Sequence, residues 1–131
     1  FDESMALNGG DDHEFFARAS TSGFKIVWAD NAIVHEIVPA SRATLHWIVK
    51  RGFRVGTSSA WIQLKHHTDS RGRLLTHGVY CVVKGAALAL SLLLCGRATA
   101  ARGLQLLSYG VGRIAGSSGH LHQEYRVIHG S

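Results

Sequence analysis

The chain has 131 residues, of which 46% are hydrophobic, so it can form a domain with a packed core, and this composition excludes a disordered tail. Its formal net charge of +5 is unevenly distributed: residues 1–40 hold seven acidic and two basic residues, whereas residues 41–131 hold two acidic and twelve basic ones. An acidic block before a basic, apolar block indicates two different roles.

The basic residues alternate with long apolar runs and match no recognisable nucleic-acid-binding module. We therefore expect no nucleic-acid partner, but an anionic membrane surface or phosphate-bearing substrates. Cys81 and Cys95 both lie in apolar sequence, which favours reduced, buried thiols in a cytoplasmic chain. The chain opens at Phe1 without a signal-peptide pattern, so we expect a fragment whose N-terminal part is missing.

Two adjacent acids, Asp11 and Asp12, follow two glycines near the start of the sequence. Either acid can cap a short helix, which Gly23 is expected to end. The alternating, β-rich residues 24–28 and 32–35 then predict two short strands joined by a turn. The first part of the chain is therefore expected to contain a helix followed by a strand pair.

A long amphipathic helix is predicted from a cap at Ser41 to residue 64, with one buried stripe and one cationic face. Residues 65–73 are polar and predict a loop. Residues 74–96 carry one formal charge, Lys84, and exceed the roughly 20 apolar residues that suffice to cross a bilayer. A central lysine nevertheless opposes membrane insertion by roughly 2.5–3.5 kcal/mol.

Cations flank this apolar run on both sides, and the positive-inside tendency would keep both flanks in the cytoplasm. We therefore expect residues 74–116 to form a re-entrant or interfacial, membrane-associated helical pair. The alternative is a buried core helix beside an amphipathic one in a soluble domain. The predicted divisions of the chain are residues 1–64, 65–73, 74–116 and 117–131.

Adjacent aspartates at the start of a helix have a simple structural role. They cap the helix and complement its dipole, each contributing about 0.3–1 kcal/mol, and composition alone favours this role. A catalytic role needs an exposed turn with room for another group to approach the backbone. Gly9 and Gly10 provide that room.

Residues 1–56 carry a series of motifs that resembles the C-terminal part of the catalytic domain of family 2 glycosyltransferases. The motifs are Phe1-Asp2-Glu3, then Gly10-Asp11-Asp12, then the helix, glycine and strand pair. The resemblance implies a GT-A fold, an α/β nucleotide-sugar-binding domain, here followed by the apolar helical pair. Residues 38–47, with Val38-Pro39, Arg42, Thr44 and Trp47, and Glu124-Tyr125-Arg126 are similar to the bacterial exopolysaccharide-biosynthesis type.

The resemblance assigns Asp12 as the general base of an inverting transfer and Asp11 as a supporting acid. Such a reaction needs one carboxylate within reach of the acceptor hydroxyl, because the hydroxyl loses its proton as its oxygen attacks the anomeric carbon. The predicted contacts to the acceptor or to the diphosphate are Gly10, Arg42, Trp47, Lys50, Arg51 and Arg54. For the cations the alternative is a solvated helix face, and for Trp47 it is core packing.

A metal ion, Mg²⁺ or Mn²⁺, is implied by the same resemblance, because carboxylate-held cations stabilise a departing diphosphate. The Asp-x-Asp motif that binds this metal in the family is absent from the sequence, so its main ligands are expected upstream of Phe1. His35 is an additional candidate ligand, with a structural role as the alternative. His66-His67-x-Asp69 lacks a second cluster at zinc spacing and is expected to be a polar loop.

We therefore expect a segment of an inverting glycosyltransferase at the cytoplasmic face of the bacterial inner membrane. It would transfer a sugar from a nucleotide-sugar donor to a saccharide or lipid-linked acceptor in cell-surface polysaccharide synthesis, and it would be inactive without the nucleotide-binding half. Ala43 and His46 stand where processive relatives have glutamine and arginine, which favours transfer of a single sugar. The alternative is a non-catalytic membrane-docking module of a larger protein.

Overall fold

The computed structural model describes residues 10–119, apart from the side chains of residues 92–95. The regular elements of this part are α1 (Asp11–Thr21), the 3₁₀-helix η2 (Ala40–Ala43), α2 (Leu45–Lys65), α3 (Arg71–Leu90) and α4 (Leu92–Ser117). The motifs Phe1-Asp2-Glu3 and Glu124-Tyr125-Arg126 lie outside the described residues.

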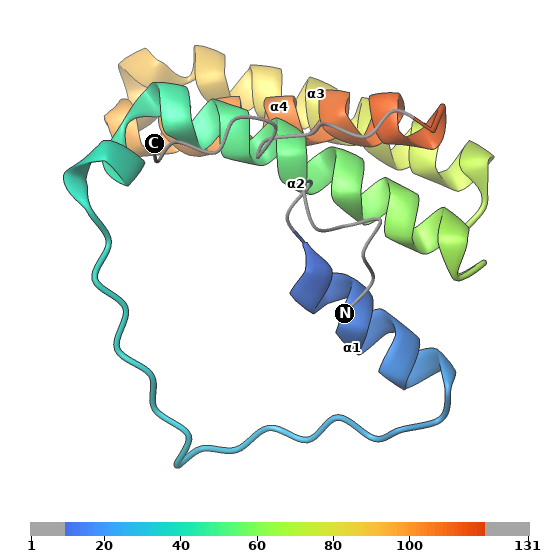
Figure 1. The fold of residues 1–131 in the computed structure, drawn as a ribbon. Helices are drawn as coiled ribbons and strands as arrows, with labels where there is room; N and C mark the ends of the chain where they lie inside the picture. Colours follow the sequence, from blue (N-terminus) through green and yellow to red (C-terminus); the bar gives the residue numbers. More distant parts are fainter. Residues whose placement is uncertain (1–9, 120–131) are drawn as a thin grey trace, which may run out of the picture.

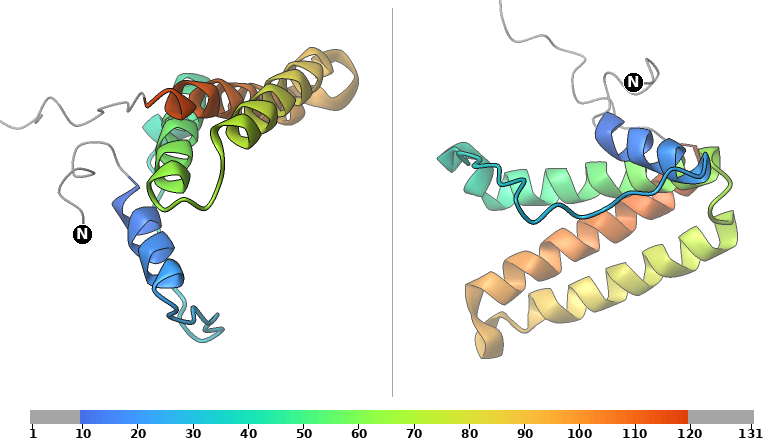
Figure 2. Two further views of the ribbon diagram at one scale, coloured as in Figure 1. Left: turned by 90° about the vertical axis from the view of Figure 1, so that its right-hand side faces the viewer. Right: turned by 90° about the horizontal axis from the view of Figure 1, so that it is seen from below.

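Three long helices form one layer, in which α4 lies between α2 and α3 (Figures 1 and 2). Both outer helices pack along α4, and α3 and α4 are joined as a helical hairpin. The short helix α1 lies against one side of α2, and the segment between α1 and η2 runs out as an open loop (Figure 1). The layer therefore provides the support on which α1 is held.

Small residues allow α2 and α4 to approach closely. The facing residues are Gly52, Gly56 and Ala60 of α2 and Ser108, Gly112 and Gly116 of α4. In each helix they recur every four residues and therefore share one face. A Cβ atom added at Gly116 would lie only 2.6 Å from the carbonyl oxygen of Thr57, so the two backbones are in direct contact. This is the small-xxx-small pattern that brings helices into close contact.

A second glycine interface joins α3 to α4. Gly78 and Gly85 of α3 are seven residues apart and face Gly110 and Gly103 of α4, which have the same spacing. A Cβ atom added at Gly110 would lie 2.6 Å from the carbonyl oxygen of Gly78. One added at Gly85 would lie 2.7 Å from the carbonyl oxygen of Gly103. Contact between backbones, rather than between large side chains, therefore holds the hairpin together.

The long apolar run of residues 74–96 is not one helix. Helix α3 ends at Leu90, the chain turns at Ser91, and α4 is itself interrupted by a kink at Gly96. Gly96 has φ 81° and ψ 172°, a backbone conformation that is almost confined to glycine. Among the described residues, no helix combines the length and the apolar character needed to cross a membrane.

The α/β fold predicted from the sequence is wrong for this structure, which is helical and contains no strand among residues 10–119. Residues 24–28 and 32–35 are extended but form no ladder. Most of their large apolar side chains are strongly exposed, for example Trp28 at 89% and Val34 at 88%. An isolated pair of strands is at best marginally stable in water, and the described residues supply no third strand and no covering helix for it. Alternation alone was therefore insufficient to form a sheet.

The helix ends follow the predictions only in part. Gly10, not Asp11 or Asp12, is the N-cap residue of α1, and Thr44, not Ser41, caps α2 by accepting the Trp47 amide at 3.2 Å. Ser41 lies in η2 instead, because the chain makes a 3₁₀ turn before the helix begins. Gly23 follows the end of α1 with φ +85°, as the sequence predicted.

Candidate functional site

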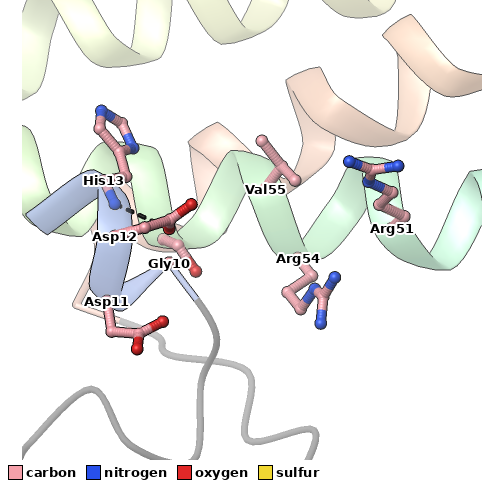
Figure 3. A pocket seen from close by; sticks show the side chains of 8 residues that line it. Gly10, Asp11, Asp12, His13, Arg51, Arg54 and Val55 are labelled. Atoms are coloured by element: carbon pink, nitrogen blue, oxygen red, sulfur yellow. Dashed lines mark hydrogen bonds between the residues drawn. The ribbon is translucent and has the colours of Figure 1, made fainter. Parts of the chain in front are cut away.

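A cavity of about 530 Å³ lies between the start of α1 and the middle of α2. Its lining residues are Gly10, Asp11, Asp12 and His13 from the first turn of α1, and Arg51, Arg54, Val55 and Ser58 from α2 (Figure 3). The structure thus brings both predicted acids together with Gly10, Arg51 and Arg54 around one space.

The backbone at Gly10 sets the direction in which the two acids are presented. Gly10 has φ 105°, which glycine adopts at little cost, and it supplies no side-chain cap. Asp11 and Asp12 follow in the first helical turn, and both are exposed. The Asp12 Oδ1 atom accepts a hydrogen bond from the His13 amide at 2.7 Å. Successive helical residues point about 100° apart, so the two carboxylates leave α1 in different directions (Figure 3).

Positive charge enters the cavity from α2. Arg51 and Arg54 are three residues apart, so their side chains share one side of the helix. The guanidinium carbon of Arg51 lies 5.0 Å from the centroid of the Trp47 ring, which is a cation–π contact. Trp47 therefore acts on the site through Arg51. Two carboxylates and two guanidinium groups around one space can bind an anion beside a group that accepts a proton.

Glu14 attaches α1 to the C-terminal end of α2. Its side chain is fully buried, and Oε1 accepts hydrogen bonds from Lys65 Nζ at 3.1 Å and from His66 Nε2 at 3.2 Å, with that ring nitrogen as donor. Arg18 lies one turn further along α1, with Nη2 4.0 Å from Oε2. Few other contacts join the two helices, so this carboxylate holds the acid-bearing end of α1 near the arginines.

The pKa of Glu14 lies below its ordinary value. Burial raises the pKa by disfavouring the charged carboxylate, but the hydrogen bonds from Lys65 and His66 and the charges of Lys65 and Arg18 together lower it further. Glu14 is therefore ionised near neutral pH. Its Oε2 atom is buried without a hydrogen-bond partner, so the attachment depends on the contacts made by Oε1.

Four of the predicted site residues are not part of the cavity lining, and Lys50 of α2 is one of them. Arg42 lies in η2 and is half exposed, with Nη1 3.5 Å from Glu36 Oε1. Trp47 contacts Arg51 but does not itself line the cavity. His35 belongs to the exposed extended segment. Binding roles for these four residues stay predictions.

The described residues contain no group of three or more His, Cys, Asp or Glu side chains that could hold a metal ion. Asp11 and Asp12 diverge, and the His66 ring is bound to Glu14. The residues present therefore do not fit a complete magnesium or manganese site. The identity of the main metal ligands stays a prediction.

Sequence analysis did not identify Glu14 or Ser58 as parts of this region. Ser58 could have been found, because it lies seven residues after Arg51, two helical turns along the same face. Glu14 has no comparable signal, since its partners lie 51 and 52 residues away in the sequence. Only the packing of α1 on α2 identifies it.

Part of the chain is similar to a known protein. The chain is 43% identical over 56 residues to the succinoglycan biosynthesis protein ExoM of Rhizobium meliloti (strain 1021). The match covers 43% of this chain and 18% of that relative, so the chain spans less than a fifth of the relative it matches. No family model matches the sequence, and no solved structure matches it significantly. The chain is therefore a partial homologue of a succinoglycan biosynthesis protein.

Proposed function

We propose that the protein acts in polysaccharide synthesis as an inverting glycosyltransferase of family 2, moving a sugar from a nucleotide-sugar donor to a saccharide or lipid-linked acceptor. The main support for the proposal is that Asp12, Arg51 and Arg54 line the same cavity. The partial similarity to ExoM supports the same general role. This chain supplies the base and the cationic side of the site in a longer protein.

In this mechanism Asp12 takes the proton of the acceptor hydroxyl through its second carboxylate oxygen, since Oδ1 already accepts the His13 amide. The hydroxyl oxygen forms a bond to the anomeric carbon on the face opposite the leaving group. The bond between that carbon and the diphosphate oxygen breaks, and the electron pair leaves with the diphosphate. Asp11 binds another acceptor hydroxyl, and Gly10 leaves room for the acceptor.

The leaving diphosphate needs positive charge. Arg51 and Arg54 supply it by charge-assisted hydrogen bonds to phosphate oxygens, and guanidinium groups suit this role because they present paired donors. Trp47 holds the Arg51 guanidinium against its ring before the diphosphate binds. Arg51 therefore loses less side-chain conformational entropy on binding. Mg²⁺ or Mn²⁺, which the resemblance implies, would be held mainly by residues before Phe1.

The test is sugar transfer by the full-length protein in bacterial membranes. Membranes receive a panel of nucleotide sugars and a lipid-linked acceptor extract, and mass spectrometry detects acceptors that gain one sugar. Asp12→Asn should lower transfer by about 10²–10⁴-fold, the usual contribution of a general base. Asp30→Asn is the matched control, because Asp30 is an exposed acid outside the cavity. Unchanged transfer by the Asp12 variant would refute the assignment.

A second candidate function, membrane docking, is favoured by one specific observation. Leu75, Val79 and Val83 recur every fourth residue on α3 and are 41%, 52% and 64% exposed. Arg71 lies one turn before Leu75 on the same helix and would favour anionic lipids. We propose that this stripe rests on the cytoplasmic face of the inner membrane. Val79→Asp with Val83→Asp should then release the protein from anionic vesicles in a flotation assay, whereas continued flotation would exclude this surface.

A further inference from the structure

Arg113 is a buried cation without a charged partner among residues 10–119. Only 4% of the residue is exposed, and its two hydrogen-bonding partners are neutral. Nη1 donates to the Tyr109 hydroxyl at 3.1 Å, and Nη2 donates to Gln63 Oε1 at 3.0 Å. The Nε atom is buried and has no hydrogen-bond partner, and no ion pair among residues 10–119 includes Arg113.

This arrangement is unfavourable unless something else compensates the charge. A buried guanidinium loses its hydration. Neutral dipoles, together with the Tyr109 ring whose centroid lies 5.9 Å from the guanidinium carbon, replace only part of that stabilisation. Each Nη group also carries two N–H donors, of which the hydrogen bonds to Tyr109 and Gln63 use one apiece. Positive charge and donor capacity therefore remain for an external anion.

A cavity of about 520 Å³ gives such an anion access to Arg113. Gln63 of α2 lines one side of the cavity, and residues from the first half of α3 line the other side. Arg113 of α4, the middle helix of the layer, also lines the cavity. This cavity shares no lining residue with the one at Asp12, and Gln63 lies on a different face of α2 from Arg51 and Arg54. The two sites are therefore distinct.

Further donors line the cavity from α3. The Arg73 side chain is 80% exposed, and its Nε lies 3.3 Å from Asp69 Oδ1. The Tyr80 hydroxyl accepts a hydrogen bond from Lys84 Nζ at 3.3 Å, so its own proton is available to a ligand. The lining thus offers a buried cation, an exposed cation and a hydroxyl donor. Asp69, which also lines the cavity, can accept from a hydroxyl of the same ligand.

We propose that this cavity is a second binding site, which takes the phosphate group of a free phosphate compound or of a lipid headgroup. Arg113 and Arg73 bind the phosphate oxygens, and Tyr80 donates a third hydrogen bond. Guanidinium groups match phosphate oxygens in pairs, and a bound phosphate supplies the counter-charge that Arg113 lacks within residues 10–119. The proposal does not depend on sugar transfer at Asp12.

The experiment measures binding of radiolabelled inorganic phosphate to the full-length protein by equilibrium dialysis. Arg113→Gln and Arg73→Gln should each weaken binding by about tenfold or more, as expected for lost hydrogen bonds between charged groups. Arg97→Gln is the matched control, since Arg97 is exposed and does not line the cavity. Arg73→Gln keeps the test valid if Arg113→Gln does not fold, because Arg73 is largely exposed.

A second arm identifies the source of the phosphate. Vesicles of phosphatidylcholine with or without phosphatidic acid are floated with the protein and its variants. Loss of phosphatidic-acid-dependent flotation in Arg73→Gln, together with competition by inorganic phosphate, assigns a lipid headgroup. Phosphate binding without that dependence assigns a free ligand. Absence of binding in both arms, or equal binding by wild type and both cavity variants, would overturn the proposal.

Discussion

Replacement of Glu14 by glutamine tests whether one buried carboxylate holds α1 in place. Glutamine keeps the size of the side chain but removes the negative charge that faces Lys65, His66 and Arg18. Few other contacts join α1 to α2. We therefore expect α1 to open locally while the α2–α3–α4 layer stays folded.

The magnitude follows from the hydrogen bonds that are weakened. A hydrogen bond to a charged group contributes about 1.5–3 kcal/mol. The Lys65 side chain is 31% exposed and that of Arg18 47%, so both can regain water when the charge is lost, and this recovery offsets part of the cost. We expect the free energy of opening α1 to fall by about 2 kcal/mol, which corresponds to roughly 30-fold faster amide exchange.

Hydrogen–deuterium exchange of the full-length protein, resolved by peptide mass spectrometry, measures this effect. Peptides that cover α1 should exchange faster in Glu14→Gln, and peptides from α3 and α4 should not change. The control is Glu36→Gln, whose carboxylate is 72% exposed and pairs only at the surface with Arg42. Less than threefold acceleration in α1, or equal acceleration throughout the layer, would refute the reasoning.

The same variant has a defined pH dependence. Because the folded state lowers the pKa of Glu14, its contribution is complete above the ordinary value of 4.5 and is lost as the pH falls through the lowered value. Acid should therefore accelerate opening of α1 in the wild type, beyond the intrinsic pH dependence of exchange, and this component should be absent from Glu14→Gln. An identical acid response in both proteins would show that another group controls the attachment.

Three further substitutions test the packing and the helix ends, each by thermal and denaturant unfolding. Gly56→Ala should destabilise the layer by about 1–3 kcal/mol, because the added methyl group would overlap the Tyr109 carbonyl oxygen. Gly72→Ala is the control: nothing lies within 4 Å of its added Cβ, so it should be neutral or stabilise by up to about 1 kcal/mol. Equal effects of the two substitutions on stability would refute this explanation. His67→Gly should stabilise by about 1 kcal/mol, since His67 has φ 52° just beyond α2, and a loss of stability would show that its side chain contributes more than its strain. Thr44→Ala should destabilise by about 1 kcal/mol through loss of the α2 cap, and Ser41→Ala, the control outside the cap position, should not.

The sequence predicted the helices better than the segment between α1 and η2. Helical periodicity depends on contacts within one element, and the residues that begin and end α2 and α3 are local in sequence. A strand is stable only beside another strand. Residues 24–28 have the alternation of a strand, but within the described residues no sheet pairs with them. The alternating pattern of residues 24–28 therefore did not predict their structure correctly.

The candidate site was predictable only in part, for a related reason. Asp12 and Asp11 stand together in the sequence, and Arg51 and Arg54 share a face of α2, so both halves of the cavity could be identified. Their approach across about 40 positions depends on Glu14, whose contacts are entirely non-local. Arg113 was missed because a lone arginine within an apolar helix gives no sign that it will be buried without a counter-charge.

One physical cause connects the close packing of the helices with their exposed apolar surface. Gly78 and Gly85 face α4, so the interior of the hairpin is made largely of backbone contacts and accommodates few large side chains. The large apolar residues of α3 must then occupy its other faces, where Val79 and Val83 are exposed. In the apolar run that suggested a membrane helix, Gly78 and Gly85 thus lie inside, and Val79 and Val83 lie outside. An exposed apolar stripe of this kind is typical of an interaction surface. The proposed membrane contact would cover it, so the vesicle assay with substituted valines tests both the surface and the proposal.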